Sequence, residues 1–155
     1  MKILNTLLLI LVLAINSCGS PPDAYYYLIA KKTEVGPEMA MTVTLVKRFE
    51  KENWCLSETE SFDENSGFKA ECLFDEQDYA PMFEGEPVGK WYAIQRMGAF
   101  PPSVVFYEFK PPLSDKIMEH QLKRGAPHIL QFAALHKAPA EVRIFSPEGE
   151  VTDEL

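Results

Sequence analysis

An apolar segment at the start of the chain decides how much of the sequence is available to fold. The run from Leu7 to Ile15 contains no polar residue, and Lys2 places a positive charge before it. A helix that spans a bilayer needs roughly 20 apolar residues, whereas the apolar part of a secretory signal peptide needs roughly 7–15. The run therefore predicts a signal peptide over residues 1–17, and the folded domain must come from the sequence after it.

The residues that end this run resemble the lipobox of bacterial lipoproteins. In Ile15–Gly19 an aliphatic residue, a tolerant position and a small residue precede a cysteine. The resemblance covers only this N-terminal segment. It implies cleavage between Ser17 and Cys18, followed by attachment of a diacylglycerol and usually a fatty acid to Cys18. Two or more acyl chains hold a soluble domain stably at a membrane, whereas one chain binds only marginally. The alternatives are an ordinary signal peptide with a chance cysteine, or an uncleaved anchor.

The same resemblance implies a location in the bacterial cell envelope. In the sorting rule of enteric bacteria, an aspartate after the lipidated cysteine retains a lipoprotein in the inner membrane, and this chain has Gly19 there. The implied location is the periplasmic face of the outer membrane, if the organism has two membranes. Residues 18–23 would then form a tether that spans at most about 20 Å.

The cysteine count fits this interpretation. An exported protein with three cysteines has one thiol that requires an explanation, and lipidation of Cys18 supplies it. The remaining pair, Cys55 and Cys72, is expected to form a disulfide in an oxidising compartment. Two buried free thiols are the alternative. A metal site is less favoured, because neither cysteine belongs to a Cys-x-x-Cys pair.

Length and charge bound the function of the mature chain. Removal of the first 17 of the 155 residues leaves 138, enough for one domain over residues 24–155. Lys2 leaves with the signal peptide, so the net charge of −8 becomes about −9. An acidic domain is a poor candidate for binding nucleic acid, or for binding an anionic membrane by charge. Membrane attachment would therefore depend on the covalent anchor.

The first part of the domain contains one clear strand and one ambiguous segment. Residues 24–30, with three consecutive tyrosines, predict a half-buried strand. We expect a helix over residues 37–53, because Pro37 fits the first turn, basic residues lie near the end and Asn53 is a plausible stop. The alternative is a strand, since residues 41–45 alternate between apolar and polar.

The next segment predicts two strands, at residues 54–56 and 67–74, which the disulfide would join. An acidic turn at 61–67 separates them. Its carboxylate and amide groups at 63–65 are consecutive, whereas an EF-hand loop places its ligands at alternate positions. We therefore interpret it as a solvated turn rather than a calcium site.

The second half of the chain predicts further strands and one helix. Residues 75–89 are broken by proline and glycine and predict irregular structure, whereas 90–96 and 103–109 predict a strand pair. A helix is expected over residues 114–124, with Ser114 as its N-cap and Gly125 as the residue that stops it.

The sequence predicts that Ile117, Met118 and Leu122 of this helix face the core. Residues 128–136 and 141–145 predict two more strands. Together the elements predict an α+β domain: an antiparallel sheet with one or two helices packed on it.

One loop stands out as a candidate contact for a partner. The connection 97–102 contains Met97 and Phe100 beside a rigid pair of prolines. Apolar side chains in a loop are unusual enough to suggest binding. We expect an exposed patch around Met97, Phe100 and Trp91, although an ordinary connecting loop is the alternative.

No sequence pattern identifies a catalytic residue, a metal site or a cofactor. The chain lacks Gly-x-Ser-x-Gly, His-Glu-x-x-His and a phosphate-binding glycine loop. Dispersed carboxylates flank the cysteine pair, namely Glu58, Glu60, Glu71 and Asp75. The three histidines are His120, His128 and His136. On one strand the last two would be about 26 Å apart, but the first two could approach across a helix–strand turn.

Three function hypotheses follow. The first is a membrane-anchored envelope lipoprotein that acts as a binding or accessory module, with an envelope protein as a possible partner. The second is a small-ligand binder or hydrolase whose site is assembled from the dispersed carboxylates and histidines. The third is an acidic inhibitor of the immunity-protein type, which would neutralise a basic toxin by charge.

Overall fold

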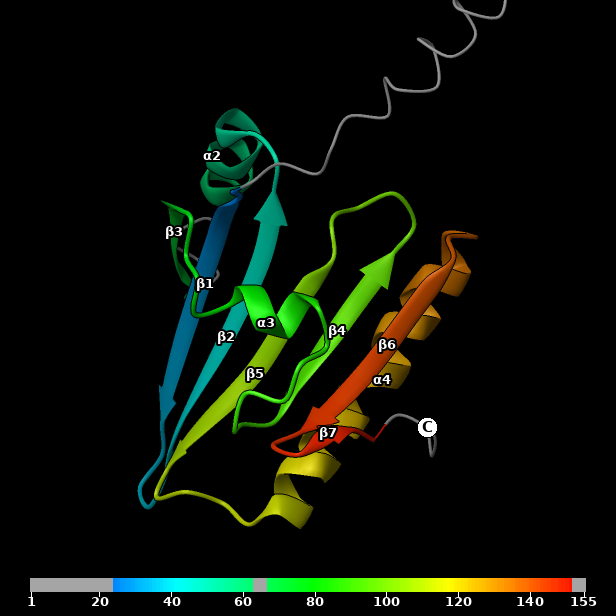
Figure 1. The fold of residues 1–155 in the computed structure, drawn as a ribbon. Helices are drawn as coiled ribbons and strands as arrows, with labels where there is room; N and C mark the ends of the chain where they lie inside the picture. The colour runs from blue at the N-terminus through cyan, green and yellow to red at the C-terminus, as the bar shows by residue number, and fades with distance from the viewer. Residues whose placement is uncertain (1–23, 63–66, 152–155) are drawn as a thin grey trace, which may run out of the picture.

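The protein folds as a mixed domain built on one twisted antiparallel sheet (Figure 1). The computed structural model describes residues 24–62 and 67–151, with side chains throughout except at 126–130, 132 and 133. The described elements in chain order are β1 (Tyr26–Val35), β2 (Ala40–Phe49), α2 (Glu52–Glu60), β3 (Lys69–Phe74), α3 (Ala80–Phe83), β4 (Tyr92–Met97), β5 (Ser103–Lys110), α4 (Asp115–Leu135), β6 (Ala140–Ser146) and β7 (Gly149–Glu150). The strand order in the sheet is β3-β1-β2-β5-β4-β6-β7. The predicted α+β class with an antiparallel sheet is confirmed.

Helices α2 and α4 pack on the same face of the sheet. Residues that pair directly across antiparallel strands point to the same face, so the register can be followed from one edge to the other. From β3 this face carries Cys72, Leu28, Ala30, Leu45, Val105, Ala93 and Ile144 in order. Cys55 of α2 lies in the same core cluster as Leu28, and Met118 of α4 lies in the same cluster as Ile144. Two separate helices therefore cover the two halves of one face.

The opposite face is covered by α3 and by the segment that leads into β4. Met82 and Phe83 of α3 pack with buried side chains of the central strands, including Tyr27, Ile94 and Phe106. Because both faces are covered, the central strands are buried on both sides and carry few polar residues there. Among the described residues, Thr44 is the one fully buried polar side chain in the core.

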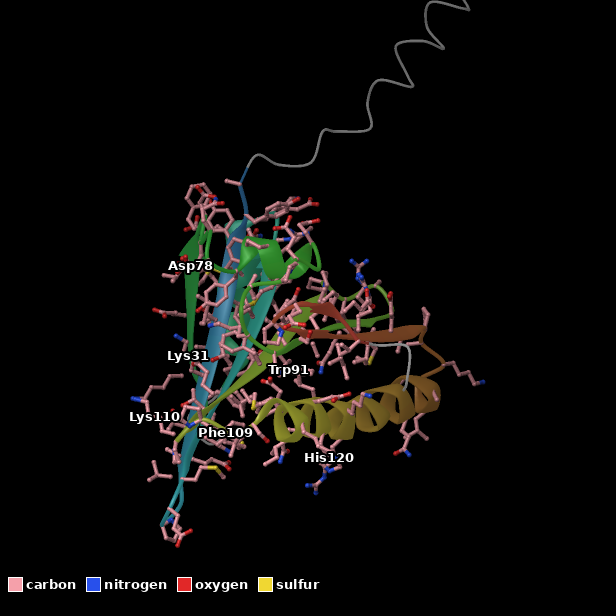
Figure 2. All side chains as sticks on the ribbon, turned by 60° about the horizontal axis from the view of Figure 1, so that its bottom comes forward. Lys31, Asp78, Trp91, Phe109, Lys110 and His120 are labelled. Carbon is pink, nitrogen blue, oxygen red and sulfur yellow. A yellow bond between two sulfur atoms is a disulfide. The ribbon has the colours of Figure 1, made fainter. Side chains whose placement is uncertain are left out.

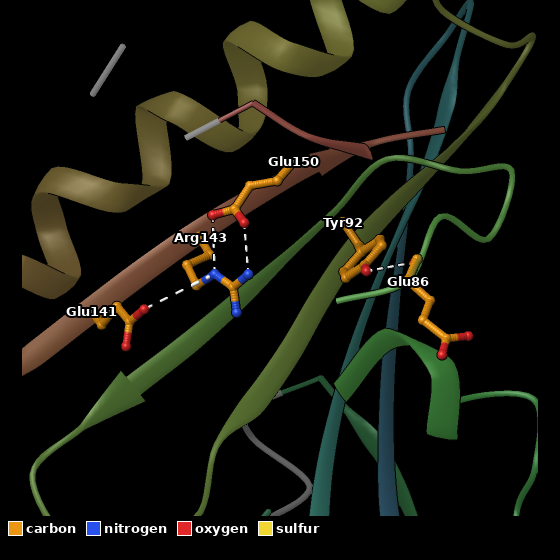
Figure 3. A network of polar contacts seen from close by, with 5 residues as sticks. All are labelled: Glu86, Tyr92, Glu141, Arg143 and Glu150. Carbon is orange, nitrogen blue, oxygen red and sulfur yellow. Dashed lines mark hydrogen bonds and ion pairs between the residues drawn. The ribbon is translucent and has the colours of Figure 1, made fainter. Parts of the chain in front are cut away.

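On this second face, a polar network links the edge strands β6 and β7 (Figure 3). Arg143 of β6 donates two hydrogen bonds to Glu150, from Nε at 3.0 Å and from Nη2 at 2.6 Å. Its guanidinium lies over the ring of Phe145, which in turn stacks on Tyr92 at 4.7 Å between centroids. The Tyr92 hydroxyl donates to the carbonyl of Glu86 at 2.7 Å. Burial raises the pKa of Tyr92 to about 12.

The helix expected over residues 37–53 is wrong. Residues 40–49 form β2, which pairs along its whole length with β1 and along most of it with β5. The alternation of apolar and polar residues at 41–45, which favoured a strand, indicated the correct structure. The strand at 54–56 is also wrong, because these residues lie in α2, so the disulfide joins a helix to a strand.

The helix predicted to end at Gly125 continues to Leu135. Residues 128–136 are therefore not a strand, and the expected helix–strand turn does not exist. Proline lacks the N–H that would bond to the carbonyl four residues earlier, so Pro127 costs one helical hydrogen bond. The residues beyond it include several strong helix formers, alanine and leucine, which favour continuation. Met118 and Leu122 face the core as predicted, whereas Ile117 is exposed.

The remaining elements lie close to their predicted positions. The tyrosine-rich segment belongs to β1, and residues 69–74, 92–97, 103–110 and 140–146 are strands. The irregular segment 75–89 includes the single turn of α3. No helix in the described part of the chain is long and apolar enough to cross a membrane.

Candidate functional site

One end of the sheet brings together elements that are distant in the sequence. At this end β1 begins, β2 and β3 finish, α2 lies across the strands, and the connection 97–102 joins β4 to β5 (Figure 1). We call it the α2 end. The tip of the β1–β2 hairpin, at residues 36–39, lies at the opposite end.

A groove of about 620 Å³ opens between these elements at the α2 end. The end of β2 forms its floor, α2 forms one wall and the 97–102 connection forms the other. The lining residues are Tyr25, Arg48, Phe49, Glu50, Trp54, Ser57, Glu58, Ala99, Pro101 and Pro102. Six of these ten residues are aromatic, proline or alanine, and the other four are charged or polar.

Large apolar side chains are exposed at the α2 end, and one of them, Trp54, lines the groove. Trp54 and Leu56 of α2 are 50 % and 47 % exposed, Phe74 at the end of β3 is 62 % exposed, and Phe100 in the connection is 68 % exposed. These four residues are called the apolar surface below. Single exposed apolar residues are normal, but their gathering at one end of a domain indicates a contact surface.

The charged groups beside the groove are held in defined contacts. Lys47 pairs with Glu58 of α2, and Arg48 pairs with Glu84 at 2.7 Å. Arg48 also lies over the ring of Tyr25, at 4.5 Å from the centroid. Lys51 lies 4.6 Å from the centroid of the Trp54 ring. A cation beside an exposed indole gives this wall an amphipathic character.

The disulfide between Cys55 and Cys72 fixes α2 to the sheet. It is the pair expected from the cysteine count, with the two Cα atoms 5.9 Å apart. Cys55 is fully buried. Because α2 is short, this bond and the packing of Cys55 hold the helix that carries Trp54 in place. The groove wall is therefore set by the fold and needs no ligand to form it.

The three predicted contact residues do not form one patch. Phe100 is exposed and Met97 is half-buried. Trp91 is buried between the sheet and α4, where its Nε1 donates to Asp115 Oδ1 at 3.1 Å (Figure 2). The inclusion of Trp91 in an exposed patch is wrong, because its ring fills the core beneath α4. Sequence reasoning missed Trp54, Leu56 and Phe74.

The dispersed carboxylates do not converge. Glu58 is on the face of the sheet that α2 covers, whereas Glu71 alternates with Cys72 along β3 and points to the other face. Glu60 is exposed at the end of α2, and Asp75 is exposed beyond β3. The acidic turn at 63–65 lies outside the described residues. Where the structure describes the chain, no group of three or more His, Cys, Asp or Glu residues could hold a metal ion.

The histidines are not brought together either. His120 and His128 both lie in α4, eight residues apart, which separates them by about 12 Å along the helix axis. His120 points to solvent from the outer side of the helix (Figure 2). The predicted approach of this pair across a turn is wrong, because there is no turn between them. His136 follows the end of the same helix.

The groove and apolar surface are therefore the feature of the described structure that points to binding. Comparisons of the chain with family models, with curated proteins and with solved structures find no match. The interpretation of the site thus depends on its own residues and on the sequence that precedes it.

Proposed function

We propose that this chain is a lipid-anchored protein of the bacterial cell envelope that acts by binding, through the groove and apolar surface at the α2 end. The observation that carries the proposal is the exposure of Trp54, Leu56, Phe74 and Phe100 on segments that meet at that end. The lipobox pattern at Ile15–Gly19 supports the anchor.

The chemistry of the groove suits binding. Tryptophan and phenylalanine present large apolar area at a small cost in side-chain entropy, and buried aromatic side chains dominate the energy of many interfaces. Trp54 stands on a helix fixed by the disulfide, so little ordering is needed when a partner covers it. The two prolines opposite, Pro101 and Pro102, restrict the other wall.

Cell fractionation tests the anchor. The full-length chain is expressed in a bacterial host beside Cys18→Ser, and membranes are washed with high salt and with alkaline carbonate. The unchanged protein should stay with the membranes and require detergent for release. Cys18→Ser should lose the acyl chains and either appear in the soluble fraction or remain as an uncleaved precursor. A wild-type protein in the soluble fraction would contradict the anchor.

Site-specific photocrosslinking in living cells tests the binding surface. A photoreactive phenylalanine analogue replaces Phe100 in one variant and Val35 in a matched control, because both side chains are strongly exposed but lie at opposite ends. The proposal expects crosslinked products from position 100 and few from position 35. Equal products from the two positions would contradict a contact surface at the α2 end.

A further inference from the structure

We infer that the apolar surface at the α2 end contacts the lipid bilayer to which the chain is anchored, so that the domain rests on the membrane by this end. The inference depends on the proposed lipid anchor at Cys18 and names the partner of the same site. It predicts a fixed orientation of the domain, in addition to attachment.

The length of the tether supplies the first argument. Only residues 18–23 separate the lipidated cysteine from the domain, and six residues span at most about 20 Å. The described part of the chain starts at Ala24, two residues before β1, and Tyr25 lines the groove. The apolar surface is therefore at the end of the domain that the anchor holds nearest to the membrane. The hairpin tip lies beyond the ten residues of β1, about 33 Å further away.

The side chains at this end supply the second argument. Tryptophan is enriched at membrane–water interfaces, where its ring lies among the lipid headgroups. The Lys51 ammonium beside Trp54 can remain at the polar boundary while its alkyl stem covers apolar surface. Leu56, Phe74 and Phe100 offer additional apolar area at the same end. A weak apolar contact is sufficient, because the acyl chains already keep the domain at the surface.

The net charge of the domain indicates whether the contact with the bilayer is electrostatic or apolar. With a mature net charge of about −9, the protein gains no long-range attraction from an anionic bilayer. The contact must then be apolar, and it should persist on neutral lipid and at high salt, which screens interactions between exposed charges.

The two tryptophans make this contact measurable. Trp91 is buried beneath α4, whereas Trp54 is half exposed in the groove wall, so a quencher dissolved in the bilayer should reach Trp54 alone. The mature lipidated protein is purified from bacterial membranes and reconstituted into vesicles of phosphatidylcholine. Its emission is compared between vesicles with ordinary acyl chains and vesicles with brominated acyl chains, at low and high salt.

Brominated lipid should remove the Trp54 share of the emission, up to about half of the total if the two tryptophans emit equally. Trp54→Phe should abolish the quenching. Phe100→Glu should reduce it severalfold, because a carboxylate at the apolar surface resists transfer to the bilayer. Val35→Glu, the matched change at the distant hairpin tip, should leave it unchanged.

Flotation of the same samples separates this inference from the proposed anchor. Protein that floats with the vesicles while its Trp54 emission ignores brominated lipid would overturn the membrane contact and leave the anchor standing. A product without lipid that does not float would overturn both. Crosslinks from position 100 to a protein in cells, with no quenching in vesicles, would also overturn the membrane contact.

Discussion

Trp91 and Trp54 have different roles because of the elements that surround them. Trp91 precedes β4 and lies in the core beneath α4, with its Nε1–H bonded to Asp115. Trp54 stands on a short helix whose buried position is taken by Cys55, so its ring is left in the groove wall. The residue type alone does not distinguish the two roles.

The same substitution at the two tryptophans should therefore have different effects on stability. Trp91→Phe loses one hydrogen bond and part of the core volume, and should lower the free energy of unfolding by about 1–3 kcal/mol. Trp54→Phe changes an exposed side chain and should stay within about 0.5 kcal/mol of the wild type. Urea unfolding followed by circular dichroism gives both values. Equal losses would refute the assignment of Trp91 to the core.

Tyr92 should contribute to the pH dependence of stability. Burial raises its pKa from 10.0 to about 12, so between these values the unfolded chain ionises this tyrosine while the native protein keeps it neutral. The native state then binds more protons, and its stability falls as the pH rises from about 10 to 12. Tyr92→Phe should cost about 1 kcal/mol at pH 8 through the lost bond to Glu86.

The decisive observation for Tyr92 is the slope between pH 10 and 12. The stability of Tyr92→Phe should fall less steeply with pH than that of the wild type, since its phenyl ring has no proton to lose. Urea unfolding at several pH values measures this slope. The same slope in both proteins would count against a raised pKa at Tyr92.

At the scale of elements, α4 tests how a helix passes through unfavourable residues. Gly125 lies inside the helix, and a Cβ added there meets nothing within 4 Å. Gly125→Ala should stabilise the protein by about 0.5–1 kcal/mol, because alanine has the higher helix propensity. Gly89→Ala provides the control, since it also meets nothing within 4 Å but has φ +72°.

In that control the new side chain enters a left-handed backbone conformation, which costs roughly 1–2 kcal/mol. The two Gly-to-Ala changes should therefore move the thermal midpoint in opposite directions. A loss of stability from Gly125→Ala would show that the helix does not continue through this position.

The disulfide is the strongest single constraint on α2. Its separation of 17 residues corresponds to roughly 3 kcal/mol in the chain-entropy model. The double variant Cys55→Ala, Cys72→Ala should be destabilised by about 2–4 kcal/mol, as should the reduced wild type. Reductant should not affect the double variant. A wild type that is equally stable with and without reductant would contradict the bond.

The sequence patterns predicted two elements wrongly, the segment 37–53 and the end of α4, and both errors have the same physical origin. In residues 37–53, proline and the basic residues matched helix ends by chance, while two neighbouring strands determined the outcome through pairing on both sides of β2. In α4, Gly125 and Pro127 are ordinary stop signals, yet the helix passes both. The secondary structure of both segments depends on strand pairing and tertiary packing, which a local sequence pattern does not show.

At the scale of the whole molecule, the sequence predicted the fold class more reliably than the site. The alternation of apolar and polar residues in the strands was sufficient to predict the antiparallel sheet. The exposure of Phe100 was predicted from its place in the 97–102 connection. Trp54 and Leu56 were missed because they were assigned to a strand. Phe74 was missed because it belongs to β3, whose place at the edge of the sheet is not contained in the sequence pattern. A surface assembled from α2, β3 and the 97–102 connection is visible only after folding.

The proposed anchor and the inferred membrane contact together give the domain one orientation. The apolar surface would face the bilayer, and the β1–β2 hairpin would project away from it. Val35 and Met39 are exposed at that tip, 81 % and 40 %, so this end would be the part most accessible from the surrounding compartment.

The most direct test of the account is the mass of the N-terminal tryptic peptide of the protein purified from bacterial membranes. We predict a peptide of residues 18–31 that carries a diacylglycerol and a fatty acyl group on Cys18, and its absence from the Cys18→Ser variant. An unmodified N-terminus produced by cleavage elsewhere would contradict the lipid anchor. The membrane-facing orientation of the α2 end would then have no basis.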